Sequence, residues 1–261
     1  MGTDCCATAD FYATPRGAMV ARLLRERIGV IWPSLRGQSV LGLGYAAPYL
    51  RLWREEVQRC VAVMPAQLGT ARWPLSGPNL SCSVEEACLP FPDLCFDRIL
   101  LVHGLEVAEH ARRLLREVWR VLKDDGRLLV VAPNRRGMWA YVETTPFGHG
   151  QPYSAGQIGR LLAASMFRVE RRDAALFMPP LRLRPVLRSA RLWESGARLM
   201  LPLGMAGLTI SEAVKDVYAA MPVAAATPPR RMVIAEAAWR PAARVSAAEE
   251  RTSDPHGSTG R

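Results

Sequence analysis

Two of the histidines are candidates for acid–base catalysis. His103 directly follows the apolar run 96–102, and His149 lies between two glycines in a long aperiodic stretch. An imidazole titrates near neutral pH, so each side chain is a candidate general base. A structural or solvated histidine at the end of a strand explains His103 equally well. For His149 we predict a position over the site, in a lid, with a surface histidine as the alternative.

Aromatic side chains accompany these histidines. The stretch 134–153 contains Trp139, Tyr141 and Tyr153 as well as His149. Loops of this length in a compact domain are functional or disordered, and the aromatic content argues against disorder. We therefore predict that these rings shape a pocket. Tyr12 could close its other side from the N-terminal segment, and otherwise it is a surface aromatic.

A short glycine turn is the other candidate site. Gly42 and Gly44 end an apolar run that begins at Val40, and Pro48 follows after Tyr45 and two alanines. The pattern predicts a buried strand that turns tightly into a helix. Turns of this kind receive nucleotide-type ligands at the carboxyl ends of the strands in open α/β sheets. An ordinary strand-to-helix turn fits the same residues.

Alternating strands and helices must position these residues. Thr14 and Pro15 predict the start of a helix that runs to Trp32, and Ser154 predicts the start of one that runs to Ala164. The alternation predicts an α/β fold with a doubly wound, mostly parallel sheet. Further helices are expected at 48–57 and 111–122, and strands at 38–44, 60–63, 80–84, 96–102, 128–132, 167–171 and 208–214, with a turn at 124–126.

Composition limits the class of protein. The 261 residues carry a net charge of +10, which comes from arginine because Lys123 and Lys215 are the only lysines. Solvated basic faces explain this charge better than nucleic-acid binding does. Six cysteines without a Cys-x-x-Cys pair, no signal peptide and no apolar run of about 20 residues predict a reduced, cytoplasmic protein.

The expected organisation has three parts. An N-terminal helical segment covers 1–37, the main domain covers 38–240, and a disordered tail covers 241–261. Within the main domain we expect a helical insertion or cap at 181–207. Its residues 182–198 alternate arginines with apolar side chains. Packing on the sheet domain is the simpler interpretation of that stretch, and peripheral membrane contact or a cap over the substrate is the alternative.

One segment of about 50 residues resembles a known family. It contains Leu-Pro-Phe-Pro-Asp at 89–93, Phe-Asp at 96–97, Leu-Glu at 105–106 and Leu-Leu-Arg-Glu-Val-Trp-Arg-Val-Leu-Lys-Asp-Asp-Gly-Arg-Leu at 114–128. This pattern is similar to the second half of a class I S-adenosylmethionine-dependent methyltransferase domain, and the glycine turn falls where the first motif of that family belongs. The resemblance covers roughly 38–134.

The resemblance implies a seven-stranded, Rossmann-like sheet with S-adenosyl-L-methionine across strands one to four. The turn would pass beside the methionine part, the end of strand two would face the ribose, the end of strand three would flank the adenine, and the residues after strand four would border the methyl group. In that order the implied cofactor-binding residues are Gly42, Gly44, Tyr45, Ala46, Met64, Pro65, Val84, Glu85, Glu86, His103 and Leu105.

The implied function is methyl transfer from this cofactor to a small-molecule or lipid-like acceptor. No Asp/Asn-Pro-Pro-aromatic run follows strand four, which argues against a nucleic-acid acceptor. Met64 stands where the family has an acid that binds both ribose hydroxyls, with Gln67 as the nearest replacement. The alternative function is therefore a non-catalytic, methyltransferase-like protein with altered or lost cofactor binding that acts as a partner-binding or regulatory module.

Overall fold

The computed structural model describes residues 5–65, 72–74, 76–85, 88–180, 189–200 and 202–216. All of them belong to one compact unit, Met1–Met221, and Pro222–Arg261 form a second unit. Several predictions lie outside the described residues: the tail 241–261, Glu86, Gln67 and the basic stretch at 181–188.

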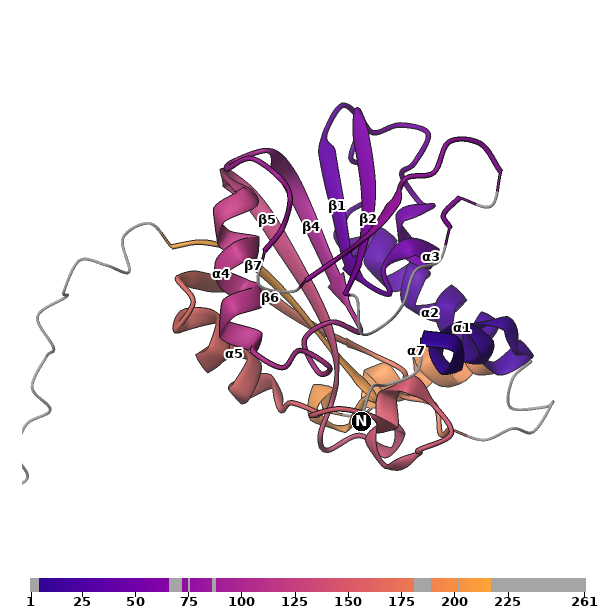
Figure 1. The fold of residues 1–261 in the computed structure, drawn as a ribbon. Helices are drawn as coiled ribbons and strands as arrows, with labels where there is room; N and C mark the ends of the chain where they lie inside the picture. The colour runs from indigo at the N-terminus through magenta and orange to yellow at the C-terminus, as the bar shows by residue number, and fades with distance from the viewer. Residues whose placement is uncertain are drawn as a thin grey trace, which may run out of the picture. The chain divides into compact units, whose positions relative to one another are not determined.

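A seven-stranded sheet forms the centre of the described unit (Figure 1). Its strand order is β3-β2-β1-β4-β5-β7-β6, and only β7 runs antiparallel to its neighbours. This confirms the predicted doubly wound, mostly parallel sheet. The strands are β1 Ser39–Gly44, β2 Arg59–Pro65, β3 Ser81–Val84, β4 Phe96–Val102, β5 Leu122–Pro133, β6 Phe167–Ala175 and β7 Leu208–Lys215.

Helices cover both faces of this sheet. The described ones are α1 Cys5–Ala13, α2 Pro15–Ile31, α3 Ala47–Leu50, α4 Ala111–Val121, α5 Ala155–Ala163 and α7 Ala190–Met200. Figure 1 shows α4 and α5 on one side of the strands and α2 and α3 on the other. Three 3-10 turns, Met138–Tyr141, Pro146–Gly148 and Leu203–Met205, lie in the connecting segments.

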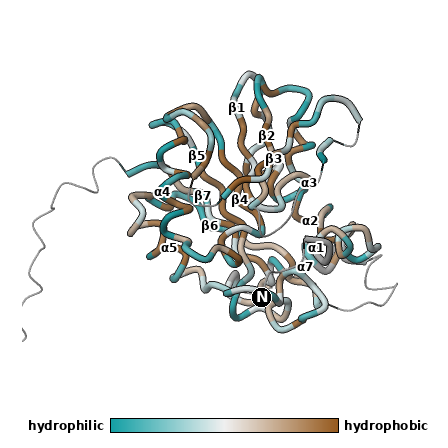
Figure 2. Tube along the Cα trace, in the orientation of Figure 1, coloured by the Kyte–Doolittle hydropathy of each residue, from teal (hydrophilic) through white to brown (hydrophobic). Residues whose placement is uncertain are grey.

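The central strands are hydrophobic along most of their length (Figure 2), and they bury apolar side chains on both faces of the sheet. Successive residues point to opposite faces of a sheet. Leu100 accordingly packs in the cluster that contains α2, whereas Leu101 packs in the cluster that contains α4 and α5. Parallel strands covered by helices on both sides read as continuous apolar runs, which is why β1 and β4 were predictable.

The predicted helix starts at 15 and 155 are confirmed by their caps. The Thr14 hydroxyl accepts the Gly17 N–H at 3.0 Å, with Pro15 at the first helical position. Ser154 and Gln157 form a reciprocal capping box. Both caps satisfy backbone N–H groups that have no partner within the helix.

The predicted helix 48–57 is wrong in length. The helix α3 is a single turn, and hydrogen bonds from residue i+3 to residue i continue the chain to Glu56 as a series of turns. Trp53 is buried and its indole N–H donates to the Trp32 carbonyl at 3.0 Å. Packing against the end of α2 therefore determines the path of this segment more than helix propensity does.

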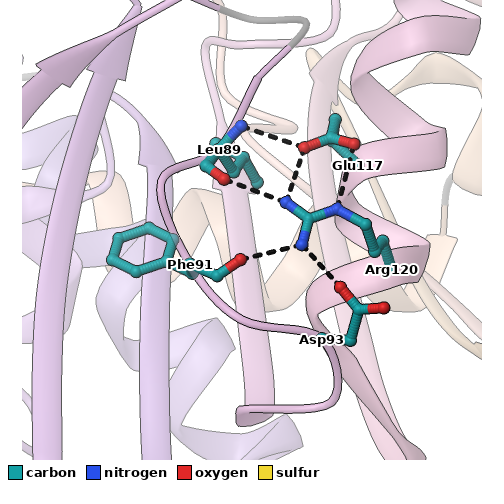
Figure 3. Close-up of polar contacts among 5 residues, drawn as sticks. All are labelled: Leu89, Phe91, Asp93, Glu117 and Arg120. Carbon is teal, nitrogen blue, oxygen red and sulfur yellow. Dashed lines mark hydrogen bonds and ion pairs between the residues drawn. The ribbon is translucent and has the colours of Figure 1, made fainter.

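The loop before β4 is fixed to α4 by one arginine (Figure 3). Arg120 donates to the Leu89 and Phe91 carbonyls at 2.9 and 2.8 Å. It also pairs with Asp93 at 2.7 Å and with Glu117 at 2.8 Å. Glu117 in turn accepts the Leu89 N–H at 2.9 Å. These residues belong to the segment that resembles the methyltransferase family, and here their contacts hold the loop that leads into β4.

Candidate functional site

The turn after β1 lies against the end of β4. Gly44 has a φ of +75°, and a Cβ atom there would lie 2.2 Å from the Val102 carbonyl oxygen. The Tyr45 N–H donates to that oxygen at 2.7 Å. Glycine is therefore required at position 44 both by the backbone conformation and by the close approach of β4.

Gly42 and Ala46 lie in the interior behind this turn. A Cβ atom at Gly42 would be 2.6 Å from Leu50 Cδ1 and 2.8 Å from Ala46 Cβ. The small residues thus let α3 pack closely on β1. A role for Gly42 and Ala46 in cofactor binding stays a prediction.

A cavity of about 610 Å³ opens beside the same turn. Its walls come from the junction of α1 and α2, the turn after β1, the end of β2 and residues 72–74 and 76. Two of the predicted cofactor-binding residues, Tyr45 and Met64, line it, and so does Tyr12 from the end of α1. Met64 is buried, with its side chain forming part of this wall.

Other predicted cofactor-binding residues lie elsewhere. Gly44, Pro65 and Val84 border a separate apolar space of about 10 Å³, which Leu89 and Leu114 also line. Glu85 is exposed at the end of β3. The structure thus places Tyr45 and Met64 at the large cavity, whereas Gly44, Pro65 and Val84 line the smaller space. The two spaces are adjacent, because Met64 and Pro65 are consecutive in β2 and Pro65 pairs with Val84.

His103 belongs to a chain of hydrogen bonds that reaches this cavity. The Tyr12 hydroxyl lies 2.8 Å from His103 Nε2, and His103 Nδ1 lies 3.0 Å from Glu106 Oε1. The buried Tyr49 hydroxyl donates to the Tyr12 hydroxyl at 2.9 Å. His103 and Glu106 are both buried, so Tyr12 is the member of the chain that lines the cavity.

Aromatic packing holds the chain in place. Tyr12 stacks on Tyr45 with 5.0 Å between ring centroids, and Phe147 covers the His103 ring at 4.8 Å. The His103 backbone has a φ of +51°, a conformation that is costly for a residue with a Cβ atom. Burial, with the neighbouring Tyr49, raises the pKa of Tyr12 well above its ordinary value. Tyr12 therefore stays a neutral phenol at physiological pH and can both donate and accept a hydrogen bond.

The second candidate base, His149, is exposed. Phe147, two residues earlier in the same loop, contacts the His103 ring. Trp139 packs edge-on against Phe147 and donates its indole N–H to the Met178 carbonyl at 2.8 Å. The loop thus supplies an aromatic cover for His103, and the predicted catalytic role of His149 stays a prediction.

Sequence reasoning missed Tyr49, Glu106 and Phe147. Glu106 follows His103 by three residues, a spacing that brings side chains together in turns and helices. That spacing was a usable signal for Glu106, whereas Tyr49 contacts Tyr12, which lies 37 positions away. Leu105, predicted beside the transferable methyl group, is fully buried in the cluster around α4.

Comparison with known proteins finds similarity to methyltransferases over part of the chain. Residues 39–130 match the family model described as a methyltransferase domain. The ubiquinone/menaquinone biosynthesis C-methyltransferase UbiE of Bordetella avium is 45% identical over 58 residues, 22% of each chain. Its counterpart from Bordetella parapertussis is 34% identical over 93 residues, 34% of each chain. The chain thus spans about a fifth to a third of the length of these relatives.

A solved structure extends the likeness to most of the fold. The SAM-dependent methyltransferase from Thermotoga maritima, described as a possible histamine N-methyltransferase, has a TM-score of 0.53 at 16% identity. The match covers 79% of this chain and 93% of that one. At this identity the match concerns the fold alone. Residues 39–130 are thus similar to a methyltransferase domain, and the strand order and this neighbour show that the described unit has the fold of the S-adenosylmethionine-dependent methyltransferases.

Proposed function

We propose that the protein transfers a methyl group from S-adenosylmethionine to a small acceptor held in the 610 Å³ cavity. The observation that carries this proposal is the chain Glu106–His103–Tyr12, which leads from a buried carboxylate to the cavity wall. Methyl transfer to a protonated nucleophile requires a route for the proton that leaves it. The chain offers such a route at the edge of the turn where the family binds its cofactor.

The cavity suits the cofactor in size and position. Cavities of roughly 300–1,000 Å³ hold small ligands and cofactors. Tyr45 and Pro48 from the turn and Met64 from the end of β2 would contact the cofactor, whose sulfonium supplies an electrophilic methyl group. The described residues that line the cavity include no carboxylate for the ribose hydroxyls. A thioether is a weak acceptor, so we expect weaker binding than an acid at position 64 would give.

The hydrogen bonds define the direction of proton movement. Tyr49 donates to the Tyr12 oxygen, which leaves the Tyr12 proton for His103 Nε2. A phenol oxygen can accept a second hydrogen bond from a group in the cavity. As that group loses its proton to Tyr12, the Tyr12 proton passes to His103. The Glu106 carboxylate at Nδ1 stabilises the imidazolium that results.

The acceptor is best sought among small aromatic or carbon nucleophiles. Two of the relatives are named as C-methyltransferases of quinone biosynthesis. Methylation at carbon releases a proton from the methylated position, which matches a site built around a proton route. The aromatic wall of Tyr12 and Tyr45 fits a planar acceptor.

Isothermal titration of the full chain with S-adenosylhomocysteine tests the proposal. We expect one binding site and a matching rise in melting temperature. The proposal fails if neither heat nor a thermal shift appears at about 1 mM ligand, a concentration that detects even weak binding.

Met64 favours one second candidate, a methyltransferase-like protein that no longer uses the cofactor. The variant Met64→Asp separates the two functions, with Met64→Leu as a matched control for packing. If the native chain binds the cofactor, both native protein and Met64→Leu should show it. If only Met64→Asp binds, the native site has lost this function.

A further inference from the structure

Four arginines line the 610 Å³ cavity, and the described lining residues contain no acid to balance them. They come from three different segments: Arg25 from α2, Arg51 and Arg54 from the turns after α3, and Arg72 from the loop after β2. The rest of the described wall is apolar or aromatic apart from Ser76. The cavity therefore combines a cationic part with an apolar body.

Most of this charge has no carboxylate partner. Arg54 pairs with the neighbouring Glu55. Arg25 Nε donates to the Ala21 carbonyl at 3.2 Å, and Arg72 donates to the Gly77 carbonyl at 2.7 Å. Within the described ranges, no carboxylate lies within 4.0 Å of the guanidinium of Arg25, Arg51 or Arg72. Carbonyl oxygens satisfy donors but leave the net positive charge in place.

Burial and a neighbouring like charge both act on Arg25. Burial, together with the nearby charge of Arg51, lowers its pKa below the ordinary value. Arg51 is exposed and Arg25 is half-buried, and both line the cavity, so their like charges repel one another there. An anion bound between them would remove this cost, and guanidinium groups bind carboxylate and phosphate oxygens in paired hydrogen bonds.

We propose that the acceptor carries a carboxylate or phosphate group, which Arg25 and Arg51 bind, on an aromatic body that lies against Tyr12 and Tyr45. This inference rests on the proposed function, because it assigns the ligand of the same cavity. The anion fixes which end of the acceptor faces the arginines, so the opposite, uncharged end lies toward Tyr12 and the proton route. The arginines recognise the anionic group and the tyrosine rings recognise the aromatic body, so the site selects aromatic anions over neutral aromatic molecules of similar size.

Three aromatic probes of similar shape, together with one anion that has no ring, test this assignment. The affinities of 2-naphthoate, 2-naphthyl phosphate, the neutral 2-naphthamide and inorganic phosphate are measured by titration calorimetry on the full chain saturated with S-adenosylhomocysteine. Charge-assisted hydrogen bonds predict that at least one aromatic anion binds about tenfold or more tightly than the amide. The carboxylate and phosphate arms show which of the two groups the site prefers. Inorganic phosphate should bind more weakly than the aromatic anions.

Arginine variants show which side chains bind the anion. Arg25→Met and Arg51→Met keep most of the apolar stem and remove the charge, and each should lower anion affinity about tenfold while the amide is unaffected. Arg22→Met is the matched control, because Arg22 lies on the same helix and is exposed. Its anion affinity should equal that of the native chain.

Two results would overturn the assignment. One is equal affinity for the anions and the amide. The other is a loss of S-adenosylhomocysteine affinity in Arg25→Met and Arg51→Met without any change in anion preference, which would assign these arginines to the cofactor. Neither result contradicts methyl transfer itself. Conversely, a chain that binds the anions without binding the cofactor supports the arginine site and contradicts the proposed function.

Discussion

At the scale of single residues, the proposed chemistry depends on which nitrogen of His103 carries a proton. Tyr49 donates to Tyr12, so Tyr12 must use its own proton toward Nε2. Nδ1 then carries the proton that binds Glu106. A histidine without these partners would have no fixed tautomer. The neighbours therefore prepare Nε2 as the acceptor before any substrate binds.

This arrangement predicts the tautomer. In ¹⁵N-edited NMR spectra of the full chain, neutral His103 should show a protonated Nδ1 and an unprotonated Nε2. Tyr12→Phe removes the hydrogen bond to Nε2 and should move the Nε2 resonance, whereas Tyr141→Phe, at an exposed site, should not. Detection of a neutral Nε2–H tautomer in the native chain would contradict the proposed direction of proton transfer.

The cluster around Arg120 makes a separate, pH-dependent prediction. The hydrogen bonds from the Arg120 guanidinium lower the pKa of Glu117 below its ordinary value of 4.5. Burial opposes this shift, and the hydrogen bond from the Leu89 N–H adds to it. A lowered pKa in the folded state stabilises the fold above the unfolded-state pKa, and this stability is lost as the pH falls through the folded-state pKa. Glu117→Gln should therefore lower the free energy of unfolding by about 0.5–1.5 kcal/mol at pH 7.

Urea unfolding between pH 3 and pH 7 measures this difference. The gap between native protein and Glu117→Gln should be largest above about pH 5 and should shrink toward pH 3. Glu143→Gln, at an exposed position, should show no such trend. A gap that stays constant over this range would show that the charge of Glu117 does not stabilise the loop.

The sequence predicted His103 as a candidate base because a histidine there directly follows an apolar strand. It could not predict the hydrogen-bond partners of His103. The contact with Tyr12 joins residues 91 positions apart, and no local pattern encodes so distant a pair. The family segment that includes Glu117 and Arg120 was the most specific sequence signal, yet its side chains fix a loop and lie outside the cavity lining.

At the scale of elements, the connection from β1 to α3 positions the site. The strand was predictable because its apolar run is buried on both faces. The length of α3 was not, because the packing of Trp53 against the end of α2 overrides helix propensity there. The helix α1, which carries Tyr12 toward the cavity, has no cap or periodic pattern comparable to that of α2, so the sequence alone predicted only the helix that follows it.

A matched pair of glycine variants tests the turn. Gly44 and Gly37 have nearly the same φ, +75° and +72°, but a Cβ atom at Gly37 would meet nothing within 4 Å. Gly37→Ala should therefore cost only the backbone strain, about 1–2 kcal/mol. Gly44→Ala adds a clash with the Val102 carbonyl and should cost clearly more, about 3 kcal/mol or above. Chemical denaturation compares them, and equal costs would contradict the close approach of β1 and β4.

At the scale of the whole molecule, the strand order places the ends of β1, β2 and β4 side by side. The large cavity lies on the α2 side of these ends, and the sheet separates it from α4 and α5. Across the described ranges, no helix combines the length and apolar character needed to cross a bilayer. Because the family model ends at residue 130, the aromatic loop over His103 lies beyond the part of the chain that it matches.

The central claim is that cofactor and acceptor share the cavity bordered by Tyr12 and Tyr45. Hydrogen exchange of the full chain, measured by mass spectrometry with and without S-adenosylhomocysteine, tests it most directly. The account predicts slower exchange in peptides covering 9–18 and 45–54, with no change in α4 and α5. Binding that leaves both of these segments unchanged and protects the residues around Pro65 and Val84 would contradict it.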